Sequence, residues 1–172
     1  MFEVGQFIVY GSSGVCKVVD IGKIEMPGMP KDRIYYTLEP CYTKGSRILT
    51  PIDNQKTIMR RLMTKEEADE LIDGVGDIEI LWIPDERRRE ESYKTMIAKC
   101  DCKELVKVIK TIYLRKEKRI AAGKKVTISD EKYFKLAEDN LYSELAVVLD
   151  MTKEEAREYM LNRIEKDAVI EE

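Results

Sequence analysis

TIMRRLMTKEE, residues 57–67, joins two different kinds of secondary structure. Its first part, residues 57–61, begins with the β-branched Thr57 and Ile58 and the apolar Met59, which is typical of a strand. Its last part, Thr64-Lys65-Glu66-Glu67, is a capping box, in which a threonine and a glutamate three residues later close the first turn of a helix. The change of pattern predicts a domain of residues 1–62 followed by a domain of residues 63–172.

Short strands dominate the sequence before this boundary. Turns rich in Gly, Pro and Asn separate the strands expected at residues 6–10, 15–24, 33–39, 46–51 and 57–61. With no helix between them, five such strands favour a small antiparallel β-barrel, in which one strand edge usually stays open to a partner strand. Alternation along residues 33–39 places Ile34, Tyr36 and Leu38 on one face and Tyr35 on the other, exposed face.

After residue 63 the apolar residues recur every three or four positions, which is the period of a helix. The capping signals and apolar stripes predict about five helices, which begin near Thr64, Pro84, Lys103, Thr127 or Ser129, and Thr152. The C-terminal half is therefore expected to be an all-α bundle, and the whole chain a two-domain α+β protein.

A basic block interrupts an otherwise acidic chain. The protein has 172 residues and a formal net charge of −3, but residues 103–125 contain nine Lys and Arg against two Glu, a net charge of +7. Lys103, Lys107 and Lys110 lie opposite an apolar stripe, as on the solvated face of any amphipathic helix. Residues 115–119 and Lys124-Lys125 have few acidic neighbours, and this local charge suits a phosphate-bearing partner.

Composition excludes the commonest kinds of catalytic site. The chain has no histidine, which rules out histidine-activated nucleophiles and imidazole metal sites. Its four cysteines form no C-x-x-C pair, and Gly11-Ser12-Ser13-Gly14 precedes a strand rather than a helix that could bind phosphate. We therefore expect neither an enzyme nor a bound cofactor or metal.

No part of the sequence resembles a membrane span or a signal peptide. A membrane helix needs about 18 apolar residues in a row, and no stretch approaches that length. We expect a cytoplasmic protein without membrane contact that acts as a monomer.

Trp82 is the only tryptophan, and the sequence leaves two interpretations open for it. Tryptophan is largely buried on average, so the residue suits a core position near the domain boundary. It also stands shortly before Arg87, Arg88 and Arg89, which suits an aromatic wedge against an unstacked base while the arginines hold phosphates.

Several motifs together resemble the CarD/CdnL family of bacterial transcription regulators. The resemblance rests on residues 7–15 (FIVYGSSGV), 51–54 (PIDN) and 58–62 (IMRRL) in the β domain. It extends through Tyr93-Lys94, residues 104–109 (ELVKVI), Ala137-Glu138 and residues 143–145 (SEL) in the helical domain. Their order and spacing cover nearly the whole chain.

The resemblance implies a Tudor-like N-terminal domain, similar to the polymerase-interacting domain of transcription-repair coupling factor, that binds the β subunit of RNA polymerase. It implies a helical domain that meets the minor groove of promoter DNA at the upstream edge of the melted bubble, largely without sequence specificity, and slows bubble collapse. DNA contacts would be Trp82, Arg87, Arg88, Arg89, Lys94, Lys124, Lys125 and Lys132. Polymerase contacts would be Arg33, Tyr35, Arg47 and Leu49.

A second class of function remains open. A basic helical surface also suits an interaction adaptor that meets an acidic protein or RNA.

Overall fold

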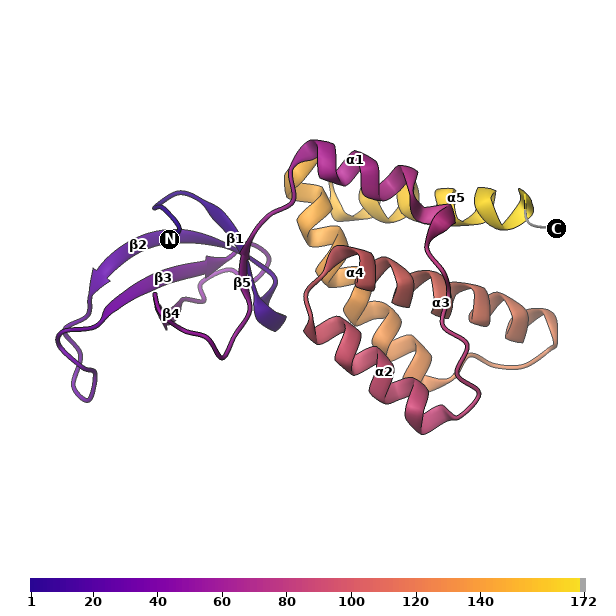
Figure 1. Cartoon of the computed structure of the whole chain (residues 1–172), viewed down its shortest axis with the longest axis horizontal. Helices are drawn as coiled ribbons and strands as arrows, with labels where there is room; N and C mark the ends of the chain where they lie inside the picture. Colours follow the sequence, from indigo (N-terminus) through magenta and orange to yellow (C-terminus); the bar gives the residue numbers. More distant parts are fainter. Residues whose placement is uncertain (171–172) are drawn as a thin grey trace. The chain divides into compact units, whose positions relative to one another are not determined.

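Five strands and then five helices follow one another within the described part of the chain (Figure 1). The structure, a computed structural model, describes the backbone of residues 1–170 and the side chains of residues 1–168. It divides into two compact units, Met1–Leu62 and Met63–Glu172. The α+β fold class is confirmed. No helix in the described residues is long and apolar enough to cross a membrane.

The first unit is an antiparallel sheet with two open edges. Its strand order is β4-β3-β2-β1-β5. The strands are β1 (Phe7–Tyr10), β2 (Val15–Lys23), β3 (Ile34–Pro40), β4 (Ile48–Pro51) and β5 (Met59–Arg61). Ile8, Val18, Tyr36 and Leu38 form its buried core with Cys16. Within the described residues, β4 and β5 each pair with one neighbour only, so the sheet is not closed and matches the expected barrel only loosely.

The exposed position expected for Tyr35 is wrong. Tyr35 is only 5% exposed, whereas Ile34, expected on the covered face, is 38% exposed. Strand β3 lies inside the sheet, with Gly22 of β2 and Pro51 of β4 paired to Tyr35. Alternation assigns the side chains of β3 to two faces, but it does not decide which positions on each face are buried.

The second unit is a bundle built around one long helix. Its helices are α1 (Lys65–Asp73), α2 (Glu86–Ala98), α3 (Cys102–Ala121), α4 (Ile128–Val148) and α5 (Lys153–Ile170). Helix α4 packs against each of the other four helices. Leu105, Ile109 and Ile112 of α3 meet Leu141 and Leu145 of α4 in the core.

The helices begin where the sequence places their caps. Thr64 and Glu67 close the capping box of α1, and Thr152 and Glu155 bond in the same way at α5. At α4 the cap is Thr127, whose side chain accepts a hydrogen bond from the backbone of Asp130. A short 3-10 turn, η2 (Val75–Asp77), follows α1 and leads into the segment that contains Trp82.

Candidate functional site

Trp82 stands in solvent rather than in the core. It lies in the segment of residues 78–85 between η2 and α2, here called the Trp82 loop, and it is 78% exposed. The interpretation of Trp82 as a core residue is therefore wrong. Lys118 of α3 is close to the ring, with its Nζ 5.9 Å from the ring centroid. A large aromatic surface held out in solvent beside a cation is typical of a contact residue.

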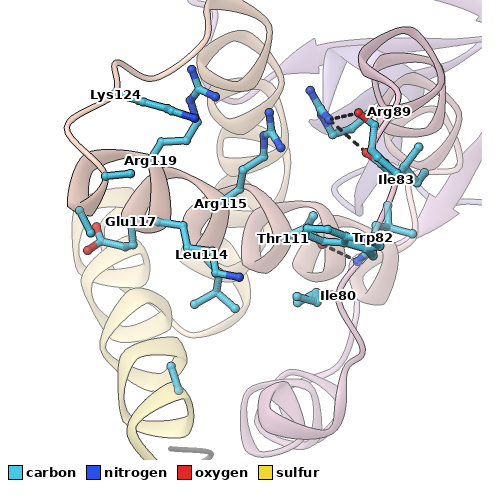
Figure 2. Close-up of a pocket in the computed structure, with 16 residues that line it drawn as sticks. Ile80, Trp82, Ile83, Arg89, Thr111, Leu114, Arg115, Glu117, Arg119 and Lys124 are labelled. Carbon is cyan, nitrogen blue, oxygen red and sulfur yellow. Dashed lines mark hydrogen bonds between the residues drawn. The ribbon is translucent and has the colours of Figure 1, made fainter.

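The backbone on both sides of Trp82 is tied to neighbouring helices. The backbone N–H of Leu81 donates a hydrogen bond of 3.0 Å to Oγ1 of Thr111 in α3. The guanidinium of Arg89 in α2 donates to the carbonyl of Ile83 at 3.0 Å (Figure 2). Thr111 and Arg89 are only 5% and 6% exposed, so the loop is held by two buried side chains. The loop is thus fixed while its aromatic side chain stays exposed.

Lys110 anchors the start of the same loop. Its Nζ donates hydrogen bonds to the carbonyls of Val75, Gly76 and Ile78 at 3.1, 3.2 and 2.9 Å. The side chain is 6% exposed, so the expectation that Lys110 lies on a solvated helix face is wrong. A buried ammonium has three donors, and this turn supplies three carbonyls that accept them.

Thr111→Val tests how firmly the loop is held. Valine keeps the shape of threonine but removes the acceptor of the Leu81 N–H, and a buried donor left unpaired costs about 1–3 kcal/mol. We expect amide hydrogen exchange at Leu81 to accelerate about tenfold or more while exchange in α4 changes little. Thr95→Val on the exposed side of α2 is the control. Unchanged exchange at Leu81 would show that the loop is held by other contacts.

The Trp82 loop separates two grooves on the helical unit. Both grooves are lined by residues 81–84. The α3 groove has a volume of about 910 Å³ and continues along the C-terminal half of α3, from Thr111 to Ala121, and onto Ala122 after the helix (Figure 2). The α2 groove has a volume of about 870 Å³ and continues along α2 and the N-terminal half of α3. The loop crosses α3 near Thr111, where the grooves divide.

The two grooves differ in chemistry. The α3 groove combines apolar side chains with five basic residues and one acidic residue, Glu117. Its apolar lining beyond residues 81–84 is Ile80, Leu114, Ala121, Ala122 and Ala168, and its basic residues are Arg89, Arg115, Lys118, Arg119 and Lys124. The α2 groove is more balanced, with Arg88, Lys99 and Lys107 against Glu91 and Glu104. The α3 groove is therefore the stronger candidate for an anionic partner.

Two of the basic residues in the α3 groove hold other parts of the helical unit in place. Arg89 holds the Trp82 loop, and Nε of Arg115 lies 2.8 Å from Oδ2 of the buried Asp130. Burial, and to a smaller degree the Asp130 charge, raises the pKa of the neighbouring Tyr93 to about 12, so this phenol is neutral at physiological pH. Lys118, Arg119 and Lys124 form no ion pair among the described residues, which leaves their charge to a partner.

The three arginines expected at the DNA differ in position. Arg87 and Arg88 are exposed in the first turn of α2, and Arg88 lines the α2 groove. The Asp85 side chain caps this turn by accepting a hydrogen bond from the Arg88 backbone. Arg89 points into the protein and donates hydrogen bonds to the carbonyls of Ile83 and Pro84. Both Arg88 and Arg89 thus lie beside the Trp82 loop. Arg88 is exposed to a partner, whereas Arg89 holds the loop in place.

The expected lysines are spread more widely. Lys124 lines the α3 groove, close to Arg119 in Figure 2. Lys125 is exposed, and its carbonyl accepts a hydrogen bond from Arg119. Neither Lys94 nor Lys132 lines the two grooves. Nζ of Lys94 lies 3.8 Å from Oε1 of Glu90, and Lys132 lies over the ring of Tyr133. Lys118 belongs to the basic block of residues 103–125, but the sequence does not single it out from the other lysines there.

The residues expected at polymerase surround the β3–β4 side of the sheet. Leu49 is 39% exposed on the edge strand β4. Arg33 and Arg47 form exposed ion pairs with Asp53 and Glu39, at 3.1 and 3.2 Å. Tyr35 lies in the neighbouring strand β3 and is buried, so it is less accessible than the other three.

Comparisons with protein families give matches in both units. The family model of the CarD-like/TRCF RID domain matches residues 2–63, and that of the CarD C-terminal domain matches residues 84–161. A comparison with curated proteins finds no match. Trp82 lies between the two matched ranges, in the loop described above. The two domain matches, in the order found along this chain, place it in the CarD/CdnL family of transcription regulators that interact with RNA polymerase.

Proposed function

We propose that this protein binds the β subunit of RNA polymerase through its sheet and holds promoter DNA at the upstream edge of the melted bubble with its helical unit. In this role it stabilises the open complex without catalysing a reaction. The observation that carries the proposal is the exposed Trp82 on a fixed loop, with basic side chains in the grooves on both sides.

The fixed loop matters because rigidity lowers the entropic cost of inserting a wedge. Minor-groove binders insert apolar side chains beside base steps, and nearby cations hold the backbone. Trp82 supplies the wedge, while Arg87, Arg88, Lys118 and Lys124 supply cations at or near the loop. Lys94, Lys125 and Lys132 are candidates for contacts further along the DNA backbone.

The open edge of the sheet supports the polymerase contact. Strand β4 pairs with β3 alone, so its outer edge has unpaired backbone groups that could extend a strand of the polymerase. Leu49 adds an apolar contact there, and Arg33 and Arg47 add charge at the rim. Since Tyr35 is buried, we propose that its role is to support this edge from within the sheet.

Tethering explains how weak DNA contacts could have a large effect. Polymerase binding places the helical unit beside the DNA, so the DNA contact becomes intramolecular and has a high effective concentration. A ligand shifts an equilibrium by its difference in affinity for the two states, and about 1.4 kcal/mol shifts it tenfold. A modest preference of the helical unit for the melted junction over closed duplex is therefore enough to stabilise the open complex.

Salt dependence of binding to a forked duplex tests the DNA contact. If the protein contacts three to four phosphates, log K should fall with log salt with a slope of about −3, which is roughly a 60-fold loss between 50 and 200 mM. Fluorescence anisotropy of labelled forked DNA measures this directly. In parallel, addition of the protein should lengthen the lifetime of open complexes formed by the cognate polymerase.

The competing function is an adaptor that uses the basic surface for an acidic protein or RNA. An adaptor for an acidic protein would show no fork binding and no effect on open-complex lifetime. Those two results together would overturn the proposal.

A further inference from the structure

We infer that the α3 groove binds an unpaired DNA strand, with bases against its apolar lining and phosphates on its basic rim. This inference rests on the proposed function and names the form of DNA that one side of the Trp82 loop accepts. It concerns a surface beyond Trp82 itself, formed mainly by the C-terminal half of α3.

The argument begins with the combination of surfaces in the groove. Leu114, Ala121 and Ala122 present apolar surface to the groove, and Trp82 adds an aromatic face. Lys118 and Lys124 line the same groove, and Figure 2 shows Lys124 beside Arg119. In duplex DNA the base faces are stacked and hidden, so the phosphates of a duplex could contact the basic side chains of the groove but its bases could not cover the apolar lining. An unpaired strand exposes base faces and phosphates together, which is the combination that single-strand binding grooves recognise.

The contrast with the α2 groove favours one side of the loop for this role. The α2 groove has three basic and two acidic residues, and its lining includes Ser92 and Thr95. The α2 groove therefore has little net charge, and a base that packed there would have to remove water from more polar side chains. The α3 groove has five basic residues against Glu117, and Lys118, Arg119 and Lys124 lack an internal ion pair among the described residues. An unpaired strand should therefore enter on the α3 side.

The groove also has room for a nucleotide. Its volume of about 910 Å³ falls within the range of about 300–1,000 Å³ typical of ligand pockets. Its wall near Trp82 is held by Thr111 and Arg89, so a base would meet a preformed surface.

Removing bases without removing phosphates tests the inference. The full chain is titrated with a forked duplex whose unpaired arm has about eight nucleotides, with the same fork carrying abasic sites in that arm, and with blunt duplex. We expect the intact fork to bind about tenfold more tightly than the abasic fork, because each stacked base contributes measurably to affinity. The salt slope should be similar for the two forks, since their phosphates are the same. Emission from Trp82, the only tryptophan, should change more with the intact fork than with the abasic fork.

A protein variant locates the strand on α3. Lys118→Gln removes one of the basic side chains of the α3 groove. It should weaken binding of the intact fork several-fold and make the slope of log K against log salt shallower by about 1. Lys103→Gln is the matched control, because Lys103 is exposed on the same helix and lines neither groove. We expect it to leave binding within twofold of the wild type.

The outcomes separate this inference from the proposed function. Equal affinity for intact and abasic forks, with a steep salt slope, would overturn the groove inference and leave the proposed DNA contact standing. An equal effect of Lys118→Gln and Lys103→Gln would also overturn it. Absence of binding to every DNA, with no change in open-complex lifetime, would overturn the proposed function as well.

Discussion

Replacing Trp82 by alanine is expected to abolish most of the lengthening of open-complex lifetime while leaving polymerase binding and the fold intact. Aromatic contact with a base contributes about 1–3 kcal/mol, and 1.4 kcal/mol corresponds to a tenfold change. We therefore expect the protein-dependent increase in lifetime to fall about tenfold. Competitor challenge of preformed open complexes at fixed salt measures it. Because Trp82 is 78% exposed, its loss should change the free energy of unfolding by less than about 0.5 kcal/mol.

Two further variants make this result specific. Trp82→Phe keeps an aromatic face and should retain an intermediate effect. Ile120→Ala removes an exposed apolar side chain of α3 that lines neither groove, and it should behave as the wild type. If Trp82→Ala lengthened the lifetime as well as the wild type does, Trp82 would have no role at the DNA.

Replacing Lys110 by methionine is expected to destabilise the helical unit by about 2–3 kcal/mol. Methionine has a similar length but no donor, so the carbonyls of Val75, Gly76 and Ile78 lose a shared partner, and buried polar groups left unpaired cost about 1–3 kcal/mol. For a unit of this size the melting temperature should fall by roughly 10–20 °C. Thermal unfolding of the full chain, followed by circular dichroism at a helix wavelength, measures the shift.

Lys103→Met is the matched control for this prediction. Lys103 lies on the same helix but is exposed, and exposed substitutions usually change stability by less than about 0.5 kcal/mol. Because Lys110 anchors the start of the Trp82 loop, the Lys110→Met variant should also bind forked DNA less tightly at temperatures where it remains folded. Equal melting temperatures for the two variants would show that the buried ammonium adds no net stability.

Local sequence signals predict most of the fold. The two capping boxes depend on residues three apart, and the structure forms both, at Thr64 and at Thr152. The five expected strands all appear, with ends shifted by one or two residues in most cases. Such features depend on neighbours in the chain, so the sequence contains the information directly.

The candidate site was only partly predictable. Sequence pointed to Trp82, to the arginines after it and to the basic block, but it left the burial of Trp82 open. It could not distinguish Arg88, which is exposed, from the adjacent Arg89, which is buried and donates to loop carbonyls. It also could not find that Lys118 lies 5.9 Å from Trp82, because 36 positions separate them and no local period relates them.

By itself, the sequence determined the α+β fold class, the two capping boxes and the family of the protein, because periodicity, capping and motif order are properties of neighbouring residues. Only the tertiary structure decided the environment of each side chain: Lys110 and Arg89 buried on loop carbonyls, Tyr35 covered within the sheet, and Trp82 exposed. These outcomes depend on which distant backbone groups and strands pack against each residue. The local sequence around a helical lysine therefore does not show whether its ammonium group is solvated or donates hydrogen bonds to three carbonyls more than thirty residues away.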